Sequence, residues 1–390
     1  MSADSGSAVD VAVIGAGIAG TSLAAALAQR GARVAVYERE GLAAGASGRN
    51  SGVLQHPFDA ALVPLYADTM AAYRRLADEV PDAGVRLPSE PAGLLLVSRH
   101  GPLVRRIADD LRAAFPALDV GVIDGAALRA LEGGLAPDVV ACRIGIGYPV
   151  VPSAPTFAFA TLAERHGATI RLGRDARPDI VGDRCLGVVV DGRSEAAGAV
   201  VVAAGPWTAE LVDPSGTWRP IRPLWGVVVE TVLADPPGHV LEEAEMDVAL
   251  GTADAAAAAG ASAEDASTTP TFSLVTAAGA TVVGSTHLDD EPEPAAWQER
   301  ILERGSSFVP ALLDAPIRGV RACARPLAVD GRPLVGAVAG IGGLFVCAGH
   351  GPWGLSTGPG SARLVADLIL DGEAAIPSAF DPGRFGNPRS

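Results

Sequence analysis

Three glycines near the N-terminus have the spacing of a tight turn from a strand into a helix. Gly15, Gly17 and Gly20 form the pattern G-x-G-x-x-G directly after the apolar, β-branched run of residues 9–14. An Ala/Leu-rich stretch with high helix propensity follows at residues 21–30. In such a unit the first glycine permits the turn, the second lets backbone N–H groups approach a pyrophosphate, and the third lets helix and strand pack. The N-terminus of the helix then stabilises the phosphate charge.

An acidic residue stands where such a unit would bind a ribose. The helical stretch closes at Gly31, and residues 34–37 predict a second strand that ends at Glu38. An acid at this place accepts hydrogen bonds from the ribose hydroxyls and disfavours a 2′-phosphate. The unit therefore predicts a site for FAD or NAD rather than NADP. Three neighbouring residues are expected in the same site, namely Ile18, Ala19 and Arg39.

Four further segments carry a resemblance to a known family. Residues 45–52 read Gly-Ala-Ser-Gly-Arg-Asn-Ser-Gly, and residues 199–207 form an apolar run that ends in Gly-Pro-Trp. Near the C-terminus, R-P-x-x-x-D-G-R-P-x-x-G at residues 325–336 precedes a strand-like run and Gly-His-Gly at residues 344–351. With the terminal helical stretch, this order resembles the FAD-dependent D-amino-acid oxidase superfamily, which includes glycine oxidase, sarcosine oxidase and D-amino-acid dehydrogenase.

The resemblance implies which residues contact FAD. The loop after the first unit would run along the ribityl chain and the flavin edge, and the glycines after the last strand would approach the flavin pyrimidine carbonyl, where negative charge accumulates on reduction. A plain Gly/Ser connector is the alternative for the loop. The implied contacts are Ser47, Gly48, Arg49, Asn50 and Ser51 in the loop, Ala204, Gly205 and Trp207 after the second cofactor strand, and Arg325, Gly349, His350, Gly351, Gly354 and Leu355 near the C-terminus.

The resemblance also implies the chemistry. Arg325 stands where the family places the arginine that pairs with the substrate carboxylate, and a planar guanidinium suits that partner. A salt bridge between domains is the alternative for Arg325, and local packing is the alternative for His350. The catalytic candidates are Arg325, His350 and Arg49. The implied reaction passes a hydride from the carbon next to nitrogen to the flavin, and water hydrolyses the resulting imine.

One cysteine raises the question of how FAD is held. Cys323 lies two residues before Arg325, which is similar to the cysteine that tethers FAD in monomeric sarcosine oxidases. We expect noncovalent FAD because an unreactive buried cysteine is commoner, with a thioether link at Cys323 as the alternative. Residues 281–287 contain no counterpart of the sarcosine-oxidase lysine that promotes oxygen reactivity. The sequence therefore leaves two alternatives for the electron acceptor: O2, as in an oxidase, or another acceptor, as in a dehydrogenase.

The expected fold is α/β, with a Rossmann-like FAD-binding domain and a second α+β substrate domain built on an antiparallel sheet. The FAD-binding domain is expected to be discontinuous, at residues 1–90, 146–220 and 320–390. Residues 91–145 and 221–319 form the expected substrate domain. The strand-like runs there are residues 93–97, 224–233, 271–276 and 280–286, the helical run is 103–115, and 253–269 reads as a loop or an exposed helix.

Composition narrows the function classes. The chain has 390 residues and a formal net charge of −15 without a Lys/Arg run, which argues against binding nucleic acid or an anionic membrane. Its four cysteines have no CxxC spacing, so we expect neither a metal site nor an iron–sulfur cluster. We expect a soluble, cytoplasmic enzyme without an integral membrane segment. A flavin monooxygenase or halogenase, or the flavin subunit of a multiprotein dehydrogenase, are the alternatives.

Overall fold

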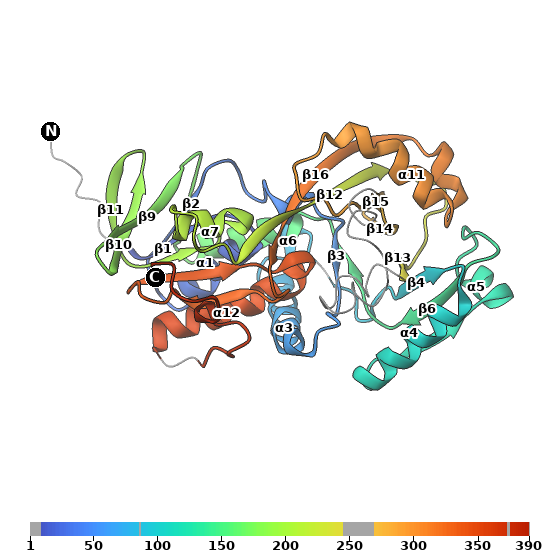
Figure 1. Cartoon of the computed structure of the whole chain (residues 1–390), viewed down its shortest axis with the longest axis horizontal. Coiled ribbons are helices and arrows are strands. Elements are labelled where there is room, and N and C mark those ends of the chain that lie inside the picture. The colour runs from blue at the N-terminus through green and yellow to red at the C-terminus, as the bar shows by residue number, and fades with distance from the viewer. Residues whose placement is uncertain (1–8, 86, 245–268, 373–374, 390) are drawn as a thin grey trace.

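A computed structural model describes residues 9–85, 87–244, 269–372 and 375–389 of the chain. Two eight-stranded sheets organise it, and Figure 1 shows them at opposite ends of the long axis. The core strands of the first sheet run in the order β17-β18-β11-β1-β2-β8. These strands are β1 (Val9–Ile14), β2 (Val34–Glu38), β8 (Thr169–Leu172), β11 (Arg193–Val202), β17 (Leu334–Ala337) and β18 (Leu344–Ala348).

The first sheet is buried on both faces. Strands β8, β2, β1, β11 and β18 are parallel to their neighbours, and β17 is antiparallel to β18. Val11 and Val13 point into one core while Ala12 and Ile14 point into another, as alternation along a strand requires. This explains why residues 11–14 of β1 are all apolar rather than alternating with polar residues.

Four helices cover one face of the first sheet. Helix α1 packs against α12 and α6, and α12 packs against α3. The other face carries β9 and β10, which continue from β11 as an antiparallel meander, and the short helix α7. The bounds are α1 (Ile18–Gln29), α3 (Val63–Glu79), α6 (Ala154–Arg165), α7 (Thr208–Val212), α12 (Gly354–Asp371), β9 (Ala176–Val181) and β10 (Arg184–Val190).

The second sheet has the order β16-β12-β15-β14-β13-β4-β6-β5. It is antiparallel except where β13 pairs in parallel with β4, so it is mixed rather than purely antiparallel as expected. The strands are β4 (Leu94–Ser98), β5 (Val120–Ile123), β6 (Val140–Ile144), β12 (Ile221–Thr231), β13 (Val240–Glu243), β14 (Ser273–Ala277), β15 (Ala280–Gly284) and β16 (Ile317–Ala328).

Helices flank the second sheet on different faces. Helix α11 (Gln298–Ser306) packs on β12 and β15, and α4 (Gly101–Ala114) packs on β4, β5 and β6 (Figure 1). Two short helices, α2 (Ala46–Arg49) and α5 (Gly125–Leu131), lie in connections, and β3 (Val53–Leu54) pairs with β7 (Tyr148–Pro149). Among the described helices, none has the length and apolarity needed to cross a membrane.

One strand crosses a predicted domain boundary. Strand β16 contains residue 320 and pairs with β12 along its whole length, so it belongs to the second sheet by its hydrogen bonds. Its far end leads into β17 of the first sheet. The division into domains stays a prediction. The Ala-rich segment falls outside the described residues except for its last position, residue 269.

Candidate cofactor and substrate site

A cavity of about 1190 Å³ is lined by residues of both sheets. Gly17, Glu38 and Trp207 line it on the side of the first sheet, and Trp225 and Arg325 line it on the side of the second. Pockets for drug-sized ligands measure about 300–1000 Å³. The cavity therefore has room for a molecule as large as a dinucleotide together with a small substrate.

The three glycines of the first turn have distinct surroundings. Gly15 has φ +108°, and a Cβ atom there would lie 2.5 Å from the carbonyl oxygen of Ala203. A Cβ atom on Gly20 would overlap the carbonyl oxygen of Gly15. At Gly17, which precedes α1, the nearest atom to a Cβ would be the Ser47 hydroxyl at 3.0 Å. Gly15 and Gly20 thus close the turn, whereas Gly17 leaves the helix N-terminus open to the cavity, which Gly17, Ile18 and Ala19 line.

The carboxylate of Glu38 is fixed at the cavity wall by backbone donors. Ala16 N–H donates to Oε2 at 2.9 Å, and Glu40 N–H donates to Oε1 at 2.8 Å. Beside it, the Arg39 guanidinium lies over the Trp207 ring, 4.2 Å from the ring centroid. The acid, the cation and the aromatic ring all line the cavity. They form a polar and flat wall of the kind that a nucleoside needs.

The loop after β2 is held mainly by its own hydrogen bonds. Ser47 Oγ accepts from Ile18 N–H at 2.9 Å, which ties the loop to the first turn of α1. The Asn50 amide donates to the carbonyls of Ala46 and Ser47 and accepts from Gly52 N–H at 2.7 Å. The Asn50 side chain therefore shapes the loop. A Cβ atom on Gly48 would overlap the carbonyl oxygen of Ala43, so this glycine permits close packing.

Arg49 and Ser51 line the cavity from the same loop. The Arg49 side chain is exposed, and its carbonyl oxygen accepts from Arg321 Nε at 3.2 Å. Arg321 also donates to the Asn50 carbonyl and pairs with Glu230 at 2.8 Å. A side chain of β16 in the second sheet thus holds the loop of the first, which the sequence did not reveal.

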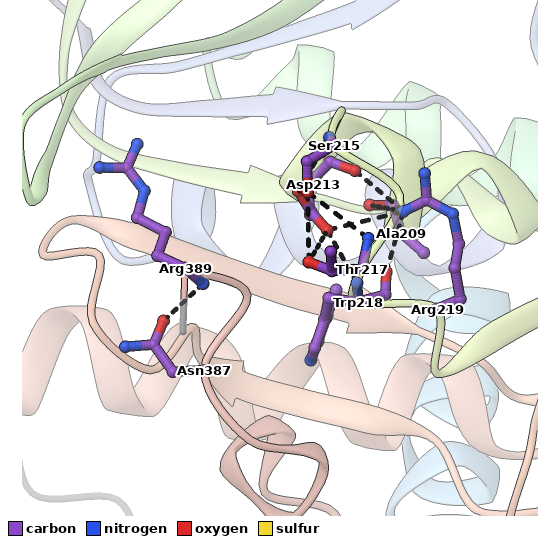
Figure 2. A network of polar contacts seen from close by, with 8 residues as sticks. All are labelled: Ala209, Asp213, Ser215, Thr217, Trp218, Arg219, Asn387 and Arg389. Carbon is purple, nitrogen blue, oxygen red and sulfur yellow. Dashed lines mark hydrogen bonds and ion pairs between the residues drawn. The ribbon is translucent and has the colours of Figure 1, made fainter.

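A second loop borders the cavity on the Trp207 side and is organised by Asp213 (Figure 2). The Asp213 carboxylate accepts hydrogen bonds from the N–H and hydroxyl of Ser215, the hydroxyl of Thr217 and the N–H of Trp218, at 2.6–3.0 Å. These bonds, with Ser215 the strongest, hold the pKa of Asp213 well below its ordinary value. Arg219 donates to the Asp213 and Trp218 carbonyls. Asp, Ser and Thr in one short run are typical of such turns.

At the second sheet, Arg325 is half-buried and lines the cavity. Its guanidinium donates to the carbonyl oxygen of Thr286 at 3.0 Å and to the hydroxyl of Ser285. Among the described residues, no carboxylate forms an ion pair with it. Burial lowers the pKa of Arg325 from its ordinary value, but that value is so high that the side chain stays charged. A Cβ atom on Gly226, in the neighbouring strand β12, would overlap this guanidinium.

Two further residues line the cavity next to Arg325. Burial, and then the positive charge of Arg325, lower the pKa of His287 to about 3, so its ring is neutral at neutral pH. Burial raises the pKa of the Cys323 thiol, against smaller lowering effects from Arg325, Arg321 and Arg49. Sequence reasoning assigned no role to His287, because a single histidine after a strand-like run carries no spacing signal.

The turn between β18 and α12 contains the predicted Gly-His-Gly motif. Gly349 and Gly351 have φ +83° and +54°, which glycine adopts without strain. The His350 ring is buried, its Nε2 lies 3.0 Å from Ser361 Oγ within α12, and burial lowers its pKa to about 4. The ring therefore packs against α12. The first residues of that helix, Gly354 and Leu355, line the cavity.

A buried carboxylate lies in the same cavity. Glu242 of β13 is 8% exposed and accepts a hydrogen bond from Gln55 Nε2 at 3.2 Å. Gln55 in turn donates its backbone N–H to Ser356 Oγ of α12 at 2.9 Å. Both Glu242 and Gln55 line the cavity. Neither was a predicted site residue, because the run Val-Leu-Glu-Glu at residues 240–243 does not show which acid faces inward.

Comparison with known proteins decides the family. The sequence profile of the family described as "FAD dependent oxidoreductase" matches residues 10–368. The chain belongs to this family of FAD-dependent oxidoreductases. The family assignment confirms the resemblance, and with it FAD as the cofactor and an oxidoreductase as the enzyme class.

Individual relatives in this family are similar along their whole length. The glycine oxidase of Geobacillus kaustophilus strain HTA426 is 28% identical over 407 residues, which cover 97% of both chains. The crystal structure of glycine oxidase from Geobacillus kaustophilus superimposes with a TM-score of 0.78 at 26% identity, covering 96% of this chain and 98% of that one. Iminodiacetate oxidase from Chelativorans sp. BNC1 gives a TM-score of 0.77 at 25% identity, with 95% and 98% covered.

The residues of this chain fit FAD. Gly17 leaves an open cradle at the N-terminus of α1, Glu38 presents a fixed carboxylate, and the N-terminus of α12 faces the cavity. The first two features suit the pyrophosphate and the ribose of the ADP half, and the third suits the electron-rich part of a flavin. The contacts of individual residues with FAD stay predictions. The side chains of Asn50 and His350 form hydrogen bonds within the protein.

Proposed function

We propose that this oxidoreductase oxidises the C–N bond of an amino acid or a secondary amine that carries a carboxylate. The observation that carries the proposal is Arg325, a charged, half-buried guanidinium in the cavity wall with hydrogen bonds to Ser285 and Thr286 but no ion pair among the described residues. A charge that a bound ligand shields from water is costly unless it is paired. A substrate carboxylate supplies that partner, and the relatives named glycine oxidase and iminodiacetate oxidase support this substrate class.

The chain's own residues bind and orient the substrate. Arg325 fixes the carboxylate, and Gly226 leaves the space in which the guanidinium lies. Neutral His287 adds no second positive charge beside it. When bound, FAD takes up two electrons and the hydrogen of the C–H bond, which leaves an imine for water to hydrolyse. We assign the FAD-binding role to residues 1–90, 146–220 and 320–390 and the substrate-binding role to 91–145 and 221–319, with β16 shared between them.

We also propose that FAD is held noncovalently. A thioether at Cys323 requires a nucleophilic thiolate, and burial raises the pKa of this thiol. Acid precipitation of the yellow protein should therefore leave the flavin in the supernatant, and Cys323→Ser should retain bound flavin. Yellow colour that stays with the precipitated wild type but not with Cys323→Ser would establish the covalent link instead.

The function is tested by anaerobic reduction of the flavin with a panel of amines and amino acids. We expect loss of the oxidised-flavin absorbance with at least one amino acid that carries an α-carboxylate. Rapid recovery of the absorbance in air would establish an oxidase, and slow recovery a dehydrogenase with another acceptor. Reduction by NADPH but by no amine would favour the monooxygenase. No reduction until a partner protein is added would favour the subunit of a larger dehydrogenase.

A further inference from the structure

His287 lies in the cavity wall directly after the two residues that anchor the Arg325 guanidinium. Ser285 accepts a hydrogen bond from Arg325 through its hydroxyl, and Thr286 accepts one through its carbonyl oxygen. The half-buried His287 follows them and lines the same cavity. After burial, the positive charge of Arg325 is the second cause of the lowered pKa of His287. Such an electrostatic effect requires that the two side chains lie close together, so an anion that pairs with Arg325 lies beside His287.

The backbone on both sides of His287 is hydrogen-bonded to β12. The Thr286 hydroxyl accepts from Val227 N–H at 2.9 Å. Leu288 and Trp225 exchange two backbone hydrogen bonds, of 2.7 and 2.9 Å. Because both neighbours of His287 are held by the adjacent strand, the position of its Cα atom in the cavity wall is fixed.

The imidazole ring of His287 forms no hydrogen bond with the part of the chain that the structure describes. At neutral pH the ring is uncharged, so it has one N–H donor and one acceptor nitrogen. A ligand that fills the cavity shields the ring from water, and a polar group that is then left without a partner costs free energy. The bound ligand is therefore expected to supply that partner.

A carboxylate held by Arg325 has room for a further donor. An ionised carboxylate has about four acceptor sites, and the two parallel N–H groups of a guanidinium fill two of them. The carboxylate only accepts hydrogen bonds, so the group of the His287 ring that it binds is the N–H. This contact strengthens the binding of an anion without adding a second positive charge to the cavity.

We propose that His287 donates a hydrogen bond to the substrate carboxylate and is a second binding residue beside Arg325. The proposal rests on the proposed function, in which Arg325 binds that carboxylate. It adds a neutral donor, supplied by the residue next to the two anchors of Arg325, to the charged one.

The test measures the Kd of propionate by titration of the flavin absorbance of the holoprotein. Propionate has a carboxylate but no amine, so its affinity reports on the carboxylate contact alone. His287→Leu removes both ring nitrogens and should weaken propionate binding about tenfold, because a hydrogen bond to a charged group is lost. Wild-type protein that does not bind propionate, or an unchanged Kd in His287→Leu, would overturn the proposal.

Two conservative variants separate the hydrogen bond from a merely structural role. His287→Asn and His287→Gln carry an amide N–H in place of the two possible ring donors, and the better of them should bind propionate within about threefold of wild type. A loss in His287→Leu that neither amide restores would also refute the hydrogen bond. His100→Leu makes the same apolar change at an exposed position before α4 and should keep the wild-type Kd within about twofold.

Anaerobic reduction gives a second readout for each amino acid of the panel that reduces the flavin. The carboxylate contact is the same in the ground state and the transition state. His287→Leu should therefore raise the half-saturating concentration about tenfold and leave the limiting reduction rate within about threefold of wild type. A slower limiting rate with an unchanged half-saturating concentration would contradict the proposal.

The outcomes separate this proposal from the proposed function. If amino acids reduce the flavin and His287→Leu leaves the affinity for carboxylates unchanged, His287 does not bind the carboxylate and the proposed function stands. If no amine reduces the flavin while propionate binding depends on the His287 donor, the carboxylate site stands and C–N oxidation falls.

Discussion

At the scale of single residues, the charge of Arg325 makes the sharpest prediction. Arg325→Met removes the guanidinium but keeps much of the apolar stem, so the substrate carboxylate loses its cationic partner in the cavity wall. Loss of one side of a buried charge pair costs about 2–5 kcal/mol. We expect kcat/KM for a carboxylate-bearing substrate to fall roughly 100-fold or more, mostly through KM. Arg318→Met, an exposed position in the same strand, should change kcat/KM less than twofold. Equal losses in both variants would contradict the assignment.

The lowered pKa values of His350 and His287 predict how the free energy of unfolding depends on pH. Burial lowers their pKa values to about 4 and about 3, from an ordinary value of 6.5. As pH falls below 6.5, the unfolded chain takes up protons that the folded chain does not, so stability present at neutral pH is lost. The loss is about 1 kcal/mol per pH unit for the buried His350 ring, and smaller for the half-buried His287 ring.

Urea unfolding at pH 7, 6 and 5 measures this loss. His350→Gln can still reach Ser361 and should show a shallower fall in unfolding free energy between pH 6 and pH 5 than wild type. His166→Gln, at an exposed position after α6, should follow the wild-type slope. A His350→Gln slope that equals the wild-type slope would mean that the His350 ring is protonated in the folded protein.

At the scale of elements, the pairing of β12 with β16 sets the position of Arg325. Cys323 is opposite Gly226, and Arg325 lies two residues further along the same face. A methyl group at Gly226 overlaps the guanidinium, so Gly226→Ala should displace it and raise KM at least tenfold with little change in melting temperature. Gly319→Ala changes a glycine of the same strand pair where a Cβ atom meets nothing within 4 Å. That variant should keep the wild-type KM, and a wild-type KM for Gly226→Ala would refute the steric argument.

Some elements of this fold can be predicted from the sequence, and others cannot. The units β1, α1 and β2 were predicted to within a few residues, because strand, glycine turn and helix follow one another and each carries a local signal. The parallel pairing of β13 with β4 was not predicted, because the two strands are far apart in the sequence. Register across β12, β15, β14 and β13 is a long-range property as well. It brings Glu242 into one cavity with Arg325 and places Gly226 against the Arg325 guanidinium, so neither residue could be found from its neighbours in sequence.

At the scale of the whole molecule, the cavity lies between the two sheets, and residues of both sheets line it. Arg321 of β16 holds the loop of residues 49–50, and Gln55 joins Glu242 to α12. A ligand that fills the cavity contacts both halves at once. Bound FAD would therefore stabilise the arrangement of the two sheets, because a ligand that binds only the folded state shifts the unfolding equilibrium by mass action.

This coupling predicts a cofactor-dependent melting temperature that distinguishes the two halves of FAD. Protein stripped of flavin should melt several degrees lower than the holoprotein, and added FAD at 100 times its Kd should restore about 3 kcal/mol. FMN lacks the adenosine that we expect to contact Glu38, Arg39 and Trp207. FMN should therefore raise the melting temperature of the stripped protein only slightly. Gly17→Val should leave the flavin-free melting temperature nearly unchanged and reduce the shift with FAD, because its side chain would enter the cradle at α1. An equal shift with FMN would mean that the first glycine turn contributes nothing to cofactor affinity.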